Sequence, residues 1–215
     1  MGFIFPHFKI FPRLVLVILL FFCVLSPETA LARVWNLSHE EPFRDGIYKG
    51  EVTEDGFQFT ILEEQNSFLY HYKLSEDFLI AQRSSVTTNV KTLENAVVGV
   101  GIGNKNEGLV MEINQAGVVF LSYCEFRGES IRYWAIKEAH TLAPSFPLLL
   151  KIVYEPLPSF VKGYANGKEV IAMSLEGNSI CSPPRRLSHC WIKTASPKGT
   201  KKAKATFSFV EAKLE

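Results

Sequence analysis

The runs Leu148-Leu-Leu-Lys-Ile-Val-Tyr154 and Ser159-Phe-Val-Lys-Gly-Tyr-Ala165 are followed at once by Asn166-Gly167 and then by a third run over residues 169–175. All three are rich in β-branched, aromatic and other apolar residues, which favours strands. Asn and Gly both tolerate the positive φ that a two-residue hairpin turn requires. We therefore predict a β-hairpin that turns at Asn166-Gly167, with one further strand before it.

The same pattern extends in both directions along the chain. Short runs of Val, Ile, Phe and Tyr with period two are separated by Gly, Asn and Pro, which predicts strands. No sustained 3.6-residue apolar pattern follows Arg33, and only residues 93–96 and 137–142 leave room for one helical turn. The expected strands cover residues 46–52, 56–62, 67–73, 78–84, 96–103, 108–114, 118–126, 130–137, 148–154, 159–165, 169–175, 190–194 and 205–214.

So many short strands predict a layered all-β protein. Antiparallel strands must close into a barrel or pack as two sheets, since otherwise too many edges and apolar faces stay exposed. The length of the chain favours a sandwich. We expect an antiparallel two-sheet sandwich over residues 45–215, preceded by a lead-in over residues 33–44.

The N-terminal 32 residues have the order of a signal peptide. Lys9 and Arg13 precede an unbroken apolar run over residues 14–25, and Ala30 and Ala32 form an A-x-A cleavage pattern. The alternative is an uncleaved membrane anchor, but a bilayer core needs roughly 20 apolar residues. We expect cleavage after Ala32 and a secreted, periplasmic or extracellular protein that is not an integral membrane protein.

Removal of this leader leaves a neutral chain. It takes away two of the 23 basic residues and one of the 22 acidic residues, so 21 of each remain. A neutral balance gives no reason to expect a nucleic-acid partner.

Three cysteines follow the predicted cleavage site: Cys124, Cys181 and Cys190. Cys181 and Cys190 bracket a short Pro-rich loop, and export permits a disulfide, so we favour a bridge between these two. A bridge from Cys124 to either of the others, or three reduced thiols, stays open.

The glycines of Gly99-Val-Gly-Ile-Gly103 alternate with apolar residues. Their spacing matches neither dinucleotide-binding nor phosphate-binding loops. We expect a strand whose glycine face is closely approached by another backbone or a bulky ring.

Four segments together resemble the concanavalin A-like jelly rolls, including the laminin G-type modules. They are residues 148–154, residues 161–170 with the reading Tyr-Ala-Asn-Gly-Lys, residues 72–80 as an early strand, and residues 205–212 as a last strand that pairs back beside the first. The resemblance implies a jelly-roll sandwich that binds glycans, adheres to proteins or cleaves polysaccharides.

Catalytic signatures are missing from the sequence. The Glu-x-Asp-x-x-Glu pattern of glycanases with this architecture does not occur, and Gly128 predicts a turn between Glu125 and Glu129, which would otherwise share a strand face. Asp occurs only at positions 45, 55 and 77, so we predict no metal site and no cofactor. The leading hypothesis is a non-catalytic module that binds a glycan or an extracellular or envelope protein. The alternatives are a polysaccharide-active hydrolase or lyase, and a structural envelope component.

Two sets of residues are candidates for ligand contact. Polar or aromatic side chains that suit a sugar interrupt apolar strands at Arg83, Glu112, Arg132 and Trp134. A basic cluster suited to an acidic polymer contains Arg185, Arg186, Lys201 and Lys202, with Lys193, Lys198 and Lys204 nearby. The alternative for this cluster is a solvated hairpin that resists aggregation.

Overall fold

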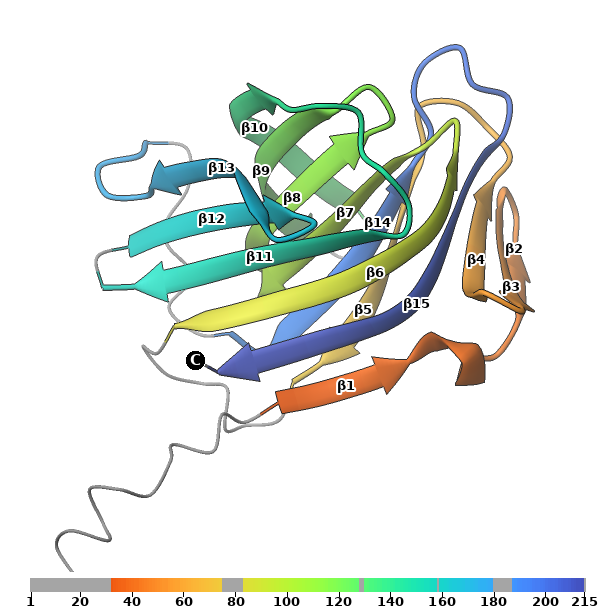
Figure 1. Ribbon diagram of the computed structural model, residues 1–215, viewed down its shortest axis with the longest axis horizontal. Coiled ribbons are helices and arrows are strands. Elements are labelled where there is room, and N and C mark those ends of the chain that lie inside the picture. Colours follow the sequence, from red (N-terminus) through yellow and green to blue (C-terminus); the bar gives the residue numbers. More distant parts are fainter. Residues whose placement is uncertain (1–31, 75–82, 128–129, 158, 180–186, 215) are drawn as a thin grey trace, which may run out of the picture. The chain divides into compact units, whose positions relative to one another are not determined.

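The computed structural model describes residues 32–74, 83–127, 130–157, 159–179 and 187–214. These residues form two antiparallel sheets and one short 3-10 helix, η1 (Leu37–His39). The predicted antiparallel two-sheet sandwich is therefore confirmed. In Figure 1, strands β11, β6 and β15 run side by side across the front, with β7, β8 and β14 behind them.

The larger sheet has nine strands. In spatial order they are β13 (Lys168–Ser174), β12 (Ser159–Ala165), β11 (Leu148–Pro156), β6 (Ser84–Glu94), β15 (Ala203–Leu214), β4 (Gly56–Ile61), β3 (Tyr48–Thr53) and β2 (Phe43–Asp45), with β1 (Ala32–Asn36) also paired to β15. The smaller sheet has six, in the order β10 (Ser130–His140), β9 (Val118–Arg127), β8 (Glu107–Asn114), β7 (Val97–Gly103), β14 (His189–Ala195) and β5 (Ser67–Lys73).

The hairpin of β12 and β13 turns where the sequence predicted. Asn166 and Gly167 have φ values of 48° and 78°, the left-handed conformation that this two-residue turn requires. The last strand, β15, pairs with β1 at the start of the described chain, whereas β5, which contains the start of the expected early strand, pairs with β14 in the other sheet.

The main core lies between the two sheets and follows the period-two alternation. Leu148, Leu150 and Ile152 of β11 face inward and are fully buried, whereas Leu149 between them is exposed. Gly163 of β12 brings the sheets close together, since a Cβ there would lie 2.1 Å from the sulfur of Met111 in β8.

Two sequence expectations need correction. Strand β6 occupies the middle of the larger sheet, although the sequence pointed to residues 78–84, most of which lie outside the described residues. The expected lead-in instead supplies β1 and β2 to the larger sheet. The two places that left room for a helical turn are largely strand, because β6 continues to Glu94 and β10 to His140.

Strand β6 was missed because its inward face is partly polar. Thr88 is fully buried between Val86 and Val90, and its hydroxyl donates a 2.7 Å hydrogen bond to the carbonyl of Phe209 in β15. A buried, satisfied threonine weakens the apolar alternation from which a strand is predicted.

A second, smaller cluster covers the other face of the smaller sheet. Leu69, Val110, Cys124 and Trp191 are buried there, and Phe126, Ile131 and Tyr133 pack against them. We call this set the concave-face cluster, because Tyr133 on edge strand β10 reaches Lys193 four strands away, with its ring centroid 3.7 Å from Nζ. In a flat sheet these strands would lie roughly 19 Å apart, so the sheet curves toward this face.

The glycines of β7 make room for this cluster. A Cβ on Gly101 would lie 2.0 Å from Nε1 of Trp191, so the indole lies directly on the glycine backbone. Trp191 is fully buried. The predicted close approach of a bulky ring to the glycine face is therefore confirmed.

The predicted Cys181–Cys190 disulfide stays a prediction: Cys190 is a free thiol in the described part of the chain, and Cys181 lies outside it. Cys190 is fully buried in the main core. Cys124 is also a buried free thiol.

Both described thiols should resist alkylation in the folded protein. Burial raises the pKa of Cys124 to about 12 and also raises that of Cys190, so at pH 8 neither carries an appreciable fraction of reactive thiolate. We expect peptide mapping after brief iodoacetamide treatment without reductant to find both unmodified in native protein and both modified after unfolding. A Cys190 that stays unmodified after unfolding would instead indicate the disulfide.

Candidate functional site

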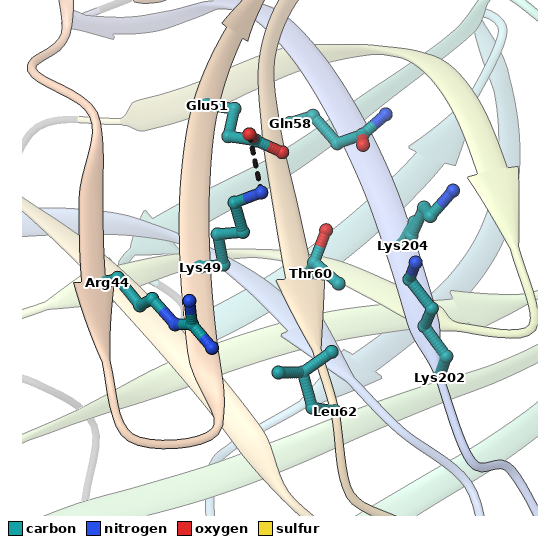
Figure 2. A pocket seen from close by; sticks show the side chains of 8 residues that line it. All are labelled: Arg44, Lys49, Glu51, Gln58, Thr60, Leu62, Lys202 and Lys204. Atoms are coloured by element: carbon teal, nitrogen blue, oxygen red, sulfur yellow. Dashed lines mark ion pairs between the residues drawn. The ribbon is translucent and has the colours of Figure 1, made fainter.

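A basic pocket lies on the outward face of the larger sheet, over β2, β3, β4 and β15. It has a volume of about 300 Å³, and we define it by its lining residues Arg44, Lys49, Glu51, Gln58, Thr60, Leu62, Lys202 and Lys204 (Figure 2). The register explains the hollow: Arg44 pairs with Lys49, Lys49 with Thr60, and Thr60 with Lys204. Long side chains thus flank a short, buried threonine.

This pocket carries more positive than negative charge. Lys49 forms a 2.6 Å ion pair with Glu51, and Lys204 forms one of 3.1 Å with Glu94. Arg44 and Lys49 nevertheless stand directly opposite each other on adjacent strands, an arrangement that is destabilising for like charges. An anion bound between these side chains would relieve that repulsion, while the polar groups of Thr60 and Gln58 offer hydrogen bonds.

A second pocket lies on the same outward face, over β11 and β12. It has a volume of about 320 Å³ and is lined by Arg83, Leu149, Lys151, Val153, Tyr164 and Gly167. Arg83, one of the predicted ligand residues, lies 3.6 Å from Glu155 in an ion pair at the edge of this pocket. The pocket combines an aromatic ring, an exposed leucine and two cations.

Glu112 has a different environment from the one expected of a ligand residue. Its carboxylate lies on the concave face and forms a 2.7 Å ion pair with Lys193, and both side chains are almost completely buried. Gly99 of β7 is the register partner of both Lys193 and Glu112 and stands between them. Because Gly99 has no side chain, the two charged side chains can reach each other across it. The Glu112 carboxylate is therefore buried and paired with Lys193 rather than exposed to a ligand.

Arg132 and Trp134 lie together on β10, away from both pockets. Arg132 is exposed and pairs in register with Glu125 of β9, and the half-buried Trp134 packs with its ring 5.8 Å from that of Tyr123. The structure therefore brings two of the four predicted ligand residues together and places Arg83 and Glu112 elsewhere.

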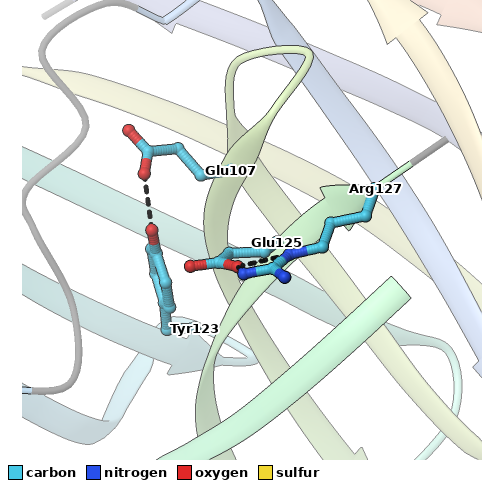
Figure 3. A network of polar contacts seen from close by, with 4 residues as sticks. All are labelled: Glu107, Tyr123, Glu125 and Arg127. Carbon is cyan, nitrogen blue, oxygen red and sulfur yellow. Dashed lines mark hydrogen bonds and ion pairs between the residues drawn. The ribbon is translucent and has the colours of Figure 1, made fainter. Parts of the chain in front are cut away.

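Two carboxylates also stand opposite each other near this point. Glu107 and Glu125 are register partners on β8 and β9. The hydroxyl of Tyr123 donates a 2.5 Å hydrogen bond to Glu107, and Arg127 donates to Glu125 at 2.9 Å (Figure 3). Both carboxylates thus have protein partners.

The predicted basic cluster divides in the structure. Lys202 and Lys204 line the basic pocket, Lys201 is exposed beside them, and Lys193 is buried on the other sheet. Arg185 and Arg186 lie outside the described residues. The sequence could not reveal Arg44 and Lys49 as partners of Lys202, because they lie about 150 residues earlier, Arg44 at the end of the expected lead-in and Lys49 in an expected strand.

The described part of the chain lacks two further features. It contains no cluster of three or more His, Cys, Asp or Glu side chains arranged to bind a metal ion. Its helical content includes no segment with the length and apolar character needed to cross a membrane.

Comparisons with known proteins identify the fold. No protein-family model matches the chain, and no curated protein matches it in sequence. Among solved structures, a galectin-like protein of unknown function from Bacillus subtilis superposes with a TM-score of 0.57 at 10% identity, covering 86% of this chain and 90% of that one. The chain folds as a concanavalin A-like jelly roll.

Two enzymes of known structure have a similar fold. The Crh5 transglycosylase in complex with NAG gives a TM-score of 0.57 at 12% identity, covering 85% of this chain and 84% of that one. The kappa-carrageenase of Pseudoalteromonas carrageenovora gives 0.52 at 6% identity, covering 88% and 97%. Identities this low establish the jelly-roll fold alone.

Proposed function

We propose that this jelly roll is a non-catalytic binding module for an acidic glycan. The observation that carries the proposal is the basic pocket, in which four cations surround a hollow with one carboxylate in its lining. Lys and Arg side chains bind carboxylate and sulfate groups through charge-assisted hydrogen bonds. The pocket therefore suits a sugar unit that carries an anionic group.

The remaining lining residues fit a sugar better than a bare ion. Thr60 and Gln58 present a hydroxyl and an amide, and Leu62 presents an exposed apolar surface for the C–H face of a pyranose. Sugar sites combine such polar and apolar groups. Two proteins of similar fold form complexes with saccharides, Crh5 with NAG and the carrageenase with an oligotetrasaccharide of kappa-carrageenan.

The proposal includes an extracellular or envelope location. Its support is the order of charge, apolar run and small residues in the predicted leader, residues 1–32. N-terminal sequencing of protein recovered from the secreted or envelope fraction tests this, with Arg33 as the expected first residue.

Charge reversal in the basic pocket should abolish most binding. In the double variant Arg44→Glu/Lys202→Glu we expect the affinity for polygalacturonate or dextran sulfate to fall at least roughly tenfold, since each charge-assisted hydrogen bond contributes about 1.5–3 kcal/mol. Both side chains are exposed, so the fold should tolerate the change. Calorimetric titration measures the affinity.

The matched control reverses two exposed lysines that border the smaller sheet, Lys73→Glu/Lys105→Glu. It changes the net charge equally but should leave most of the affinity. Wild-type binding should also weaken steeply as salt rises to about 0.15 M, where the Debye length is about 8 Å. Equal losses in both double variants would show a nonspecific charge effect and contradict a site at the pocket.

A polysaccharide-active enzyme is the second candidate function, and the pairing of Glu107 with Glu125 favours it. Two carboxyl groups that face one sugar are what glycoside hydrolysis requires. Turnover of a polysaccharide by the wild type, lost in Glu125→Gln, would replace the binding proposal. The absence of both binding and turnover would instead favour a structural envelope component.

A further inference from the structure

The second pocket opens on the same face of the larger sheet as the basic pocket. Residues Leu149, Lys151 and Val153 of β11 alternate with the core residues Leu148, Leu150 and Ile152, so they face away from the core. Thr60 and Lys204 of the basic pocket face outward on β4 and β15 by the same alternation. Both pockets therefore open on one face of the larger sheet.

The distance between the two pockets follows from the register. Strands β11 and β4 are separated by β6 and β15, which places them three strand spacings apart, roughly 14 Å. Lys151 pairs with Thr87 of β6, and Thr206, beside the basic pocket, pairs with Thr92. Those five residues of β6 add roughly 16 Å along the strand, so the pockets lie roughly 20 Å apart.

Polar side chains line much of the surface of β6 and β15 between the pockets. Thr87 and Asn89 of β6 face outward, and Thr92 donates a 2.8 Å hydrogen bond to Thr206 of β15. Gln58 of the basic pocket donates to the same Thr206 hydroxyl at 3.3 Å. These hydroxyl and amide groups offer hydrogen bonds to a polar chain that crosses from one pocket to the other.

The second pocket differs from the basic pocket in having an aromatic wall. Tyr164 of β12 is the register partner of Lys151, so a ring and a cation stand side by side at its centre. Pyranose rings stack on aromatic faces through their C–H groups, and a neighbouring cation would hold a carboxylate or sulfate on the same sugar. A neutral inorganic ligand or a lone anion would not use the tyrosine and the exposed Leu149.

We propose that one acidic polysaccharide chain binds across both pockets, with its anionic end unit in the basic pocket and a ring farther along stacked on Tyr164. This inference rests on the proposed glycan-binding function and extends it from a single sugar unit to an extended polymer. Two subsites joined by one chain bind more tightly than either alone, because the second contact is intramolecular.

The test compares ligands of two lengths on the full chain. The probes are digalacturonate, which is too short to span the pockets, and polygalacturonate, with dextran sulfate as the sulfated counterpart and an oligodeoxynucleotide as a non-glycan polyanion. The second-pocket variants are Tyr164→Leu and Lys151→Ser, with Tyr164→Phe as the variant that keeps the ring and Lys105→Ser as the charge control.

We expect Tyr164→Leu and Lys151→Ser to weaken polymer binding roughly tenfold or more while digalacturonate binding stays unchanged. Tyr164→Phe and Lys105→Ser should retain wild-type affinity for both ligands. Unchanged thermal unfolding midpoints would show that the variants are folded, and a variant that unfolds is replaced by Leu149→Ser in the same pocket.

Each contrary result has a distinct meaning. Polymer affinity that is unchanged in both second-pocket variants, yet lost in Arg44→Glu/Lys202→Glu, would overturn the extended site and leave the proposed function intact. An equal loss for digalacturonate would also overturn it, because the second pocket would then be the main site. Equal affinity for the oligodeoxynucleotide, or no binding by the wild type, would overturn the glycan proposal itself.

Discussion

Replacing Lys193 by Met should destabilise this protein by about 3–5 kcal/mol, the cost of leaving a buried charge without its partner. The Lys193 ammonium lies 2.7 Å from Glu112, and both side chains are at most 10% exposed. The variant would also lose the cation–π contact with Tyr133. Urea unfolding at pH 7, followed by fluorescence, measures the change.

The double variant Lys193→Met/Glu112→Leu separates the ion pair from general packing. It replaces both charges with apolar groups, so we expect stability close to that of the wild type or above it. A single variant that loses less than about 1 kcal/mol would show that water reaches the pair, since exposed pairs contribute only that much.

Removal of the Trp191 side chain should cost about 3–5 kcal/mol, as large-to-small changes in a packed core do. The indole is fully buried and packs against Phe126 with ring centroids 5.3 Å apart and against the backbone of Gly101. This cost would establish that the concave-face cluster is a second core rather than an open binding surface. Urea unfolding of Trp191→Ala measures it.

The complementary change adds a methyl group beneath the ring. Gly101→Ala places a Cβ within van der Waals overlap of the indole, and such overpacking costs about 1–3 kcal/mol. In the Trp191→Ala background the same substitution should cost far less, because the group with which it collides is gone. Additive effects of the two substitutions would argue against this contact.

These expectations matter for function because they concern the face that curves inward. On the concave face, Trp191, Tyr133 and the Lys193–Glu112 pair fill the space in which a ligand would otherwise lie. The two described pockets lie instead on the outward face of the larger sheet. Binding and stability should therefore be separable by mutation.

Local patterns predicted much of the fold. The hairpin at Asn166-Gly167 was predictable because its turn conformation depends on two adjacent residues. The glycine run of β7 was predictable as a packing site because alternating glycines leave one strand face bare. Strand β6 was not predictable from local patterns. The hydroxyl of its buried Thr88 donates a hydrogen bond to the carbonyl of Phe209 in β15, about 120 residues later in the sequence.

The candidate sites also combine features that local sequence predicts with features that depend on distant residues. Lys202 and the exposed Arg83 were recognisable as polar residues suited to a ligand, and each lines a pocket. Glu112 had the same appearance in the sequence, yet it is neutralised by Lys193 across Gly99. No local signal distinguishes an acid that will be paired from one that will be free.

By itself, the sequence determined the all-β class, the two-sheet sandwich and its tightest turns, because alternation and turn chemistry act over a few neighbouring residues. Only the tertiary structure decided which charges meet. The register of β2, β3, β4 and β15 places Arg44, Lys49 and Lys204 around Thr60, whereas that of β14, β7 and β8 buries Lys193 against Glu112. Strand pairing joins residues far apart in the chain, so the same residue types become a surface pocket in one sheet and an interior ion pair in the other.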